Sequence, residues 1–143
     1  IAPFADTTPP EKMIEGLVEG QAPWVFEVAK KMARVRIADA AVKPLGAGLY
    51  EVKAWIENTG GLPYPTAMAG RNQRVLPVVV TLAGDGVTIV QGKKRSLVPS
   101  VPARGAQAVT WLVRSAKPVK IEIKAETRSA WRDSRTVALG GVQ

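Results

Sequence analysis

Residues 48–65, GLYEVKAWIENTGGLPYP, decide the fold of this chain. The first half alternates apolar and polar positions with the period of two that a strand with one buried face requires. The NTGG segment at 58–61 tolerates positive φ, and the two prolines after it cannot continue a ladder, so we expect the chain to turn and cross over here. One strand face takes Tyr50, Val52, Ala54 and Ile56, and the other takes Glu51, Lys53, Trp55 and Glu57.

Alternating segments with turn signals between them recur to the end of the chain. We expect a strand from Ala33 with a bulge near Asp39, a short strand at Leu97–Val98, and a loop at residues 66–74. About seven such strands predict an all-β fold, an immunoglobulin-like antiparallel β-sandwich. Further inward positions are expected at Val35, Ile37, Leu76, Val78, Val80, Leu82, Val109, Trp111, Val113, Val119, Ile121, Ile123, Val137 and Leu139.

The N-terminal segment has the periodicity of helices instead. Thr8 is the expected N-cap of a first helix, with Pro9 at the first helical position and Glu11 completing a capping box. Gly20 is a natural end for this helix. A second short helix is expected to begin at Pro23. Two small helices should therefore precede the sheet.

The length and composition indicate one folded domain with a helical lead-in. A chain of 143 residues can bury its own core. It begins with Ile1 and holds no apolar run near the roughly 18 residues of a membrane span, so we expect no such span and a piece of a longer polypeptide. We assign residues 1–32 to a helical linker or tail of a preceding domain, and residues 33–143 to the sandwich.

Charge is unevenly distributed along the chain. The formal net charge is +8, but residues 1–27 hold five acidic residues and one lysine, so this part carries −4 and the remainder +12. A basic domain attracts polyanions or an acidic partner surface. Solvated charge on the outside of a sandwich is the simpler explanation of the same pattern.

The residue types present exclude most catalytic chemistry. Histidine and cysteine are both absent, which removes the usual general base at neutral pH, the commonest zinc ligand and the Ser-His and Cys-His nucleophiles. Carboxylate pairs such as Glu122 with Glu126 alternate with lysines, as solvated charges do. The glycines at 84 and 86 lack the helix and lysine of a phosphate-binding loop. We predict that this chain is not an enzyme and holds no metal or cofactor.

Two features are candidates for binding. Trp55 lies on the polar face of its strand, where an indole either stacks on a ligand or packs against a neighbouring element. We expect the N-terminal helices to cover it, with Trp24 and Tyr64 as further interdomain or ligand contacts.

Basic residues gather in two long loops, which form a patch for an anionic polymer if they meet at one end of the sandwich. No nucleic-acid-binding module is recognisable, so nucleic acid is not an expected partner. The basic candidates are Arg71, Arg74, Lys93, Lys94, Arg95 and Arg104.

Four segments carry a family resemblance: VRI at 35–37, PLGAGLYEV at 44–52, IENTGGLP at 56–63 and VTWLVR at 109–114. Together they resemble the β-sandwich appended to the C-terminus of bacterial zinc carboxypeptidases of the M14 type. The likeness covers most of the chain from about residue 24 onward. The Asn-Thr-Gly turn is shared with many cell-adhesion-like bacterial sandwiches, and its combination with the Leu-Pro bend and the TWLVR strand points to the carboxypeptidases.

The resemblance implies a non-catalytic accessory domain that supports or docks onto a preceding catalytic domain of the same polypeptide. In that family two histidines and a glutamate hold zinc in a separate α/β domain. This chain has no histidine to match them, so the zinc belongs to the presumed catalytic domain. The resemblance also implies the periplasm or the cell exterior, with an anionic envelope polymer as a further partner. The alternative is a free-standing basic module that binds an anionic polysaccharide or an acidic protein.

Overall fold

The computed structural model describes residues 9–74, 76–128 and 131–140. The chain divides into two units, residues 1–32 and residues 33–143. The helices and strands are α1 (Glu11–Lys30), β1 (Val35–Gly46), β2 (Leu49–Asn58), α2 (Ala67–Arg71), β3 (Val78–Ala83), β4 (Val87–Gln91), β5 (Arg95–Val98), β6 (Gly105–Ser115), β7 (Val119–Glu126) and β8 (Arg132–Leu139).

The described part of the N-terminal unit, residues 9–32, holds one helix, so the prediction of two short helices is wrong. α1 runs through both Gly20 and Pro23. A glycine costs a helix only about 1 kcal/mol and a proline about 3 kcal/mol, so neither ends a helix where the following residues keep helical backbone angles. Pro10 is the N-cap and makes no side-chain cap hydrogen bond, while the predicted cap at Thr8 lies outside the described residues. Within the described ranges, no helix has both the length and the apolar character needed to cross a membrane.

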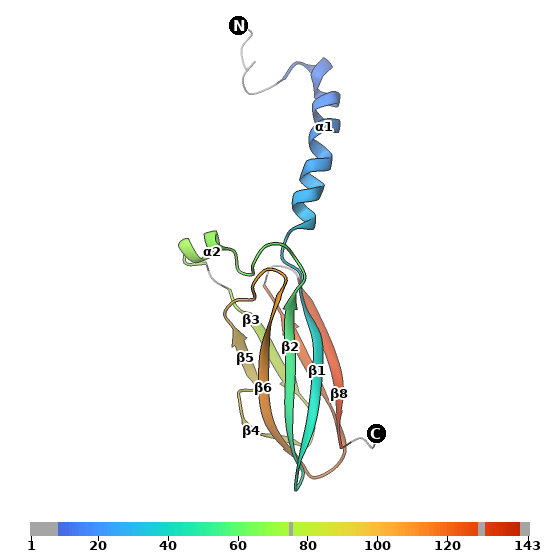
Figure 1. The fold of residues 1–143 in the computed structure, drawn as a ribbon, viewed down its shortest axis with the longest axis vertical. Helices are drawn as coiled ribbons and strands as arrows, with labels where there is room; N and C mark the ends of the chain where they lie inside the picture. The colour runs from blue at the N-terminus through green and yellow to red at the C-terminus, as the bar shows by residue number, and fades with distance from the viewer. Residues whose placement is uncertain (1–8, 75, 129–130, 141–143) are drawn as a thin grey trace. The chain divides into compact units, whose positions relative to one another are not determined.

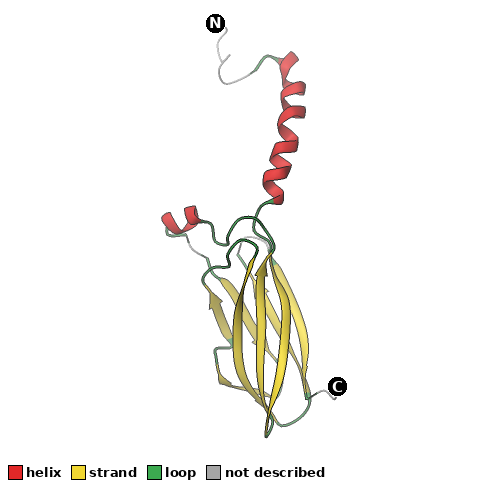
Figure 2. Ribbon diagram, in the orientation of Figure 1, coloured by secondary structure: helices red, strands yellow, loops and turns green. Residues whose placement is uncertain are grey.

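The C-terminal unit is an antiparallel β-sandwich (Figures 1 and 2). One sheet has the strand order β1-β2-β6-β4 and the other has the order β5-β3-β7-β8. Both sheets send alternate side chains into one core, in which Ile56 and Trp111 of the first sheet and Ile121 and Ile123 of the second are fully inaccessible to solvent. The predicted all-β, immunoglobulin-like class is confirmed, with eight strands in the described residues.

Local predictions are confirmed for β1, β2 and β5, but the segment before β3 differs from what the sequence predicts. β1 and β2 form the expected hairpin, with a register shift between Ile37 and Asp39 at the predicted bulge, and the short strand expected near residue 97 is β5. Leu76 is exposed and not inward, because β3 begins only after the next proline. The loop expected at residues 66–74 contains α2, which the hydroxyl of Thr66 caps.

The turn after β2 is built by the side chain of Asn58, which is fully buried. Its Oδ1 accepts hydrogen bonds from the backbone N–H groups of Arg34 (2.9 Å) and Gly60 (3.0 Å). Its Nδ2 donates to the carbonyl oxygen of Leu62 (2.8 Å). In the described chain neither Gly60 nor Gly61 is at positive φ, so the expected left-handed glycines are absent from this turn. A buried amide that satisfies three backbone groups sets the turn in their place.

We predict that Asn58→Ala lowers the free energy of unfolding by about 2–4 kcal/mol, because three backbone groups lose their hydrogen-bond partner at once. Denaturation in urea, followed by circular dichroism, measures the change. Thr59→Ala is the matched control, since the hydroxyl of Thr59 makes only a 3.5 Å contact with the carbonyl of Arg34. Equal losses in the two variants would show that the amide does not set the turn.

The chain passes from one sheet to the other between β4 and β5, and Trp111 holds this crossing in place. The indole Nε1–H of Trp111 donates to the carbonyl of Lys93 (2.9 Å). The next carbonyl, of Lys94, accepts a hydrogen bond from the N–H of Leu82 (2.9 Å) on β3. Gly92 has φ +98°, and a Cβ there would lie 2.8 Å from Cδ1 of Trp111. The crossing therefore requires glycine at this position for both its backbone angle and its contact.

Gly92→Ala should lower the free energy of unfolding by about 2–4 kcal/mol, because it combines left-handed backbone strain with a clash against a buried indole. The matched control is Gly86→Ala, since Gly86 has φ +73° but open space around its Cβ position. The control should cost only about 1 kcal/mol. Thermal unfolding of both variants measures the difference, and equal midpoints would contradict the importance of the Trp111 contact.

Side chains of β8 close one side of the sandwich against β1. Oδ2 of Asp133 accepts a hydrogen bond from the N–H of Ile37 (2.8 Å). Nη1 of Arg135 donates to the carbonyl of Ala38 (2.9 Å), and its Nη2 lies 3.1 Å from Oδ1 of Asp39. We call these interactions the β1–β8 clasp. They occupy backbone groups at the bulge of β1, where ladder pairing is interrupted.

Candidate functional site

The outer face of the β5-β3-β7-β8 sheet combines positive charge with apolar surface. The period of two turns Arg95 and Leu97 of β5 outward, and Val79 of β3 lies opposite Leu97. On the neighbouring hairpin, Glu126 of β7 lies opposite Arg132 of β8. Charged and apolar side chains from four strands therefore meet at this end of the sheet.

These side chains surround a hollow of about 460 Å³. Its apolar part comes from β3, β5 and the residues before β3, and its charged part comes from three arginines and one glutamate. We call it the arginine hollow, and it is lined by Leu76, Pro77, Val79, Arg95, Leu97, Glu126, Thr127, Arg128 and Arg132.

The three arginines are available for an anionic group. Arg95, Arg128 and Arg132 are exposed, and none of them forms an ion pair within 4.0 Å in the part of the chain that the structure describes. Guanidinium groups remain protonated and bind carboxylates with paired hydrogen bonds. The arginine hollow can thus bind a carboxylate while its apolar part covers a neighbouring hydrocarbon group.

Farther along the same face the charges alternate. A second hollow of about 300 Å³ shares Glu126 and Arg132 with the first. Here Nζ of Lys124 lies 3.1 Å from a carboxylate oxygen of Glu122. Neighbouring charges of both signs offset each other, so this region is less suited to an anion than the arginine hollow.

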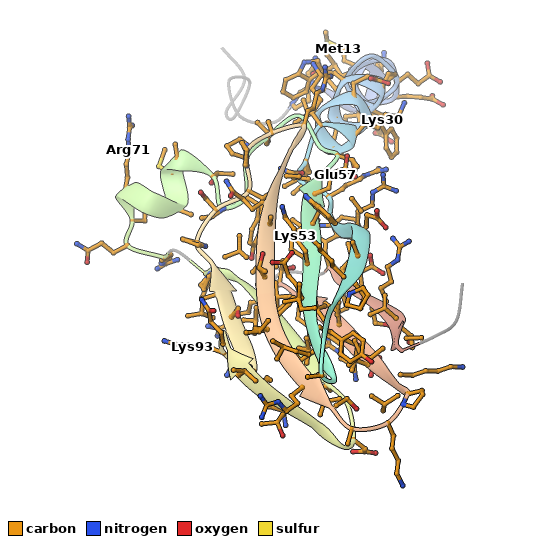
Figure 3. All side chains as sticks on the ribbon, turned by 60° about the horizontal axis from the view of Figure 1, so that its bottom comes forward. Met13, Lys30, Lys53, Glu57, Arg71 and Lys93 are labelled. Atoms are coloured by element: carbon orange, nitrogen blue, oxygen red, sulfur yellow. The ribbon has the colours of Figure 1, made fainter. Side chains whose placement is uncertain are left out.

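The basic residues predicted from the sequence are divided between the two ends of β3. Arg71 in α2 and Arg74 precede this strand, whereas Lys93 and Lys94 lie beside its last residues. Figure 3 shows Arg71 and Lys93 well apart. Arg104 directly precedes β6. Arg71 therefore lies apart from Lys93, and that the six residues form one patch stays a prediction. Of the six, only Arg95 lines the arginine hollow.

Sequence reasoning missed Arg128 and Arg132. Both flank the connection between β7 and β8, so the hairpin pattern alone indicates that they are neighbours. Their approach to Arg95 depends on the pairing of β3 with both β5 and β7. Period-of-two alternation identifies the face of a strand but not which strands adjoin, so it carries no signal for this convergence.

Trp55 lies on the outer face of the other sheet, as predicted, and is half-buried. It is opposite Asp39 of β1 and Ala108 of β6. Nζ of Lys53 lies 5.0 Å from the centroid of its ring, a cation–π contact worth about 0.5–1 kcal/mol at an exposed site. That the N-terminal helix covers Trp55 stays a prediction.

The other two aromatic candidates differ in their surroundings. Tyr64 packs against the core, and its backbone exchanges two hydrogen bonds with Val101 (3.0 and 2.7 Å). Its position therefore has a structural explanation. Trp24 is on α1 and is 64% exposed. In the described segments no three acidic side chains come together as metal ligands.

The fold and the site define a class: an immunoglobulin-like β-sandwich with a basic, partly apolar outer face. The chain belongs to the family described as Domain of unknown function (DUF8731), whose model matches residues 34–138. None of the curated proteins matches it. Among solved structures, it is similar to the GAE domain of GGA2p from Saccharomyces cerevisiae, with a TM-score of 0.41 and 11% identity. That match covers 78% of this chain and 100% of the yeast chain.

Proposed function

We propose that this chain is a non-catalytic accessory domain that docks onto an acidic protein surface through the arginine hollow. The observation that carries the proposal is the joining of three exposed arginines to an apolar surface in one hollow. An acidic side chain beside an aliphatic one on a partner protein matches both parts. Such charge complementarity accelerates association and selects the partner.

The composition of the hollow favours a protein over a polysaccharide. Among the described residues no aromatic side chain lines it, so these residues offer no flat surface on which sugar rings stack. Its apolar residues would be left uncovered by a hydroxyl-rich polymer. They are instead suited to the hydrocarbon side chains found at the centre of protein interfaces.

The resemblance to the accessory sandwich of M14-type zinc carboxypeptidases indicates which partner to expect. We infer that the acidic surface belongs to a catalytic domain that precedes this chain in the same polypeptide. In this arrangement zinc chemistry takes place in the preceding catalytic domain, and the sandwich supports or orients that domain.

An anionic envelope polymer is the second candidate partner, and one observation favours it. Residues 28–143 carry a net charge of +12, spread over both outer faces and the loops. Binding to such a polymer would depend on total charge and would weaken steeply with salt through counterion release. It would not depend on the arginine hollow in particular.

The test uses the polypeptide encoded upstream of Ile1 in the same reading frame, produced separately and titrated with this chain in a calorimeter. We expect Arg128→Glu with Arg132→Glu to weaken the affinity by about tenfold to a hundredfold, because both reversals fall on the docking hollow. The matched control is Lys43→Glu with Arg114→Glu, which removes the same charge from exposed positions on the other sheet.

Equal effects of the two double variants would overturn docking at the hollow and favour a response to total charge. Upstream sequence without zinc-binding histidines would overturn the carboxypeptidase partner. Thermal unfolding of each variant checks that it is folded before its affinity is compared.

A further inference from the structure

β6 is longer than the strand that pairs with one of its edges. It pairs with β2 along residues 105–114. On its other edge, β4 pairs only with residues 112–115 before the chain crosses to the second sheet at Gly92. In the described chain no strand continues the line of β4, so the first part of β6 has a free edge.

The ladder identifies which backbone groups face this free edge. The N–H of Ser115 donates to the carbonyl of Gly48 (2.9 Å), next to β2. Along an antiparallel strand the groups of alternate residues point to opposite edges. Odd-numbered residues of β6 therefore face β2, while Ala106, Ala108 and Thr110 face the free edge. The position of the Thr110 carbonyl supports this assignment. Its oxygen lies 3.3 Å from the Cβ position of Gly92, which is on the β4 side of the strand.

A groove of about 380 Å³ runs along this edge, between β6 and β5. Val98 of β5 and Val109 of β6 line it, together with Gln107. Gln107 and Val109 have the inward parity of their strand, yet Gln107 is exposed and Val109 only half-buried. The side chains here lack the cover that a further strand beside β6 would supply.

We propose that this groove binds an extended acidic segment of a partner protein, which adds to β6 as a strand in line with β4. Backbone hydrogen bonds to Ala106, Ala108 and Thr110 would hold it, and alternate apolar side chains would cover Val98 and Val109. The groove lies along the free edge of β6, whereas the arginine hollow lies on the outer face of the second sheet, and Leu97 lines both. The proposal does not depend on the docking function proposed above.

The charge around the groove selects the occupant. None of the described residues that line the groove is charged. Lys94 follows the residue whose carbonyl binds the indole of Trp111, next to Thr110 at one end of the groove. Arg104 comes three residues before Gln107 at the other end. An extended segment with carboxylates at both ends is complementary to this arrangement. A second copy of this chain is disfavoured as the occupant, because edge-to-edge pairing would bring basic residues of both copies together.

The probe is a capped seven-residue peptide, DVTVTVE, titrated into isotope-labelled chain and followed by nuclear magnetic resonance. Binding should shift the amide signals of Ala106, Ala108 and Thr110 and slow their hydrogen exchange by about tenfold or more. The charge-reversed peptide KVTVTVK should bind at least about tenfold more weakly. No binding at about 1 mM peptide, or shifts confined to the arginine hollow, would overturn the proposal.

Ala108→Pro tests the backbone contact, because proline removes the N–H of residue 108, which faces the groove, and leaves the β2 ladder bonded. It should weaken binding by about tenfold or more. Ala138→Pro is the matched control, because Ala138 is an exposed residue of the edge strand β8 and lines neither the groove nor the arginine hollow. It should leave the affinity within about threefold. Equal losses of affinity in the two variants would show that binding does not depend on the N–H of residue 108, and would overturn pairing of the peptide with β6.

A second measurement changes the peptide and not the protein, so its result cannot be caused by a variant that fails to fold. N-methylation of alternate peptide amides blocks hydrogen bonds from one edge of the peptide strand only. One of the two alternating sets should abolish binding and the other should preserve it. Equal effects of the two sets would contradict strand addition. Dimerisation of this chain that depends on its concentration and is blocked by Ala108→Pro would identify a second copy as the occupant, and would overturn the proposal of an acidic partner segment.

Discussion

The hydrogen bond from the indole of Trp111 to the carbonyl of Lys93 holds the crossing at which the chain passes from β4 in one sheet to β5 in the other. Because the crossing comes at Gly92, β4 ends after five residues and β6 keeps a free edge beyond it. The same crossing starts β5 at Arg95, which turns this guanidinium and Leu97 onto the outer face of the second sheet. The groove and the arginine hollow thus both depend on one buried aromatic side chain.

Alternation predicted the strands well where one face is buried and the other solvated. β2 and β7 show this pattern over nearly their whole length, and their inward positions followed directly. Prediction failed where tertiary context overrides local preference, as in α1, which runs through a glycine and a proline. The turn after Asn58 was predicted, but its cause was not, because a buried amide sets it and neither Gly60 nor Gly61 adopts positive φ.

The candidate site was much less predictable than the fold. Arg95 was named from a run of basic residues, which indicates exposure and says nothing of neighbours. Its approach to Arg128 and Arg132 requires two strand pairings between segments distant in sequence. A free edge is equally invisible in sequence, since the residues of β6 read as an ordinary strand. Composition therefore indicated only a basic domain, whose charge is explained most simply by solvated side chains, and topology was needed to locate the arginine hollow and the groove.

The β1–β8 clasp gives the end of the chain a role during synthesis. The β1–β2 hairpin forms from neighbouring residues, but Asp133 and Arg135 leave the ribosome some 75 residues later, roughly 4 to 15 seconds at typical translation rates. Throughout that interval the bulged edge of β1 lacks the groups that will occupy it. The nascent chain is then most open to pairing with a neighbouring chain. Arrival of β8 ends this period, so its two charged residues protect the hairpin as well as close the sandwich.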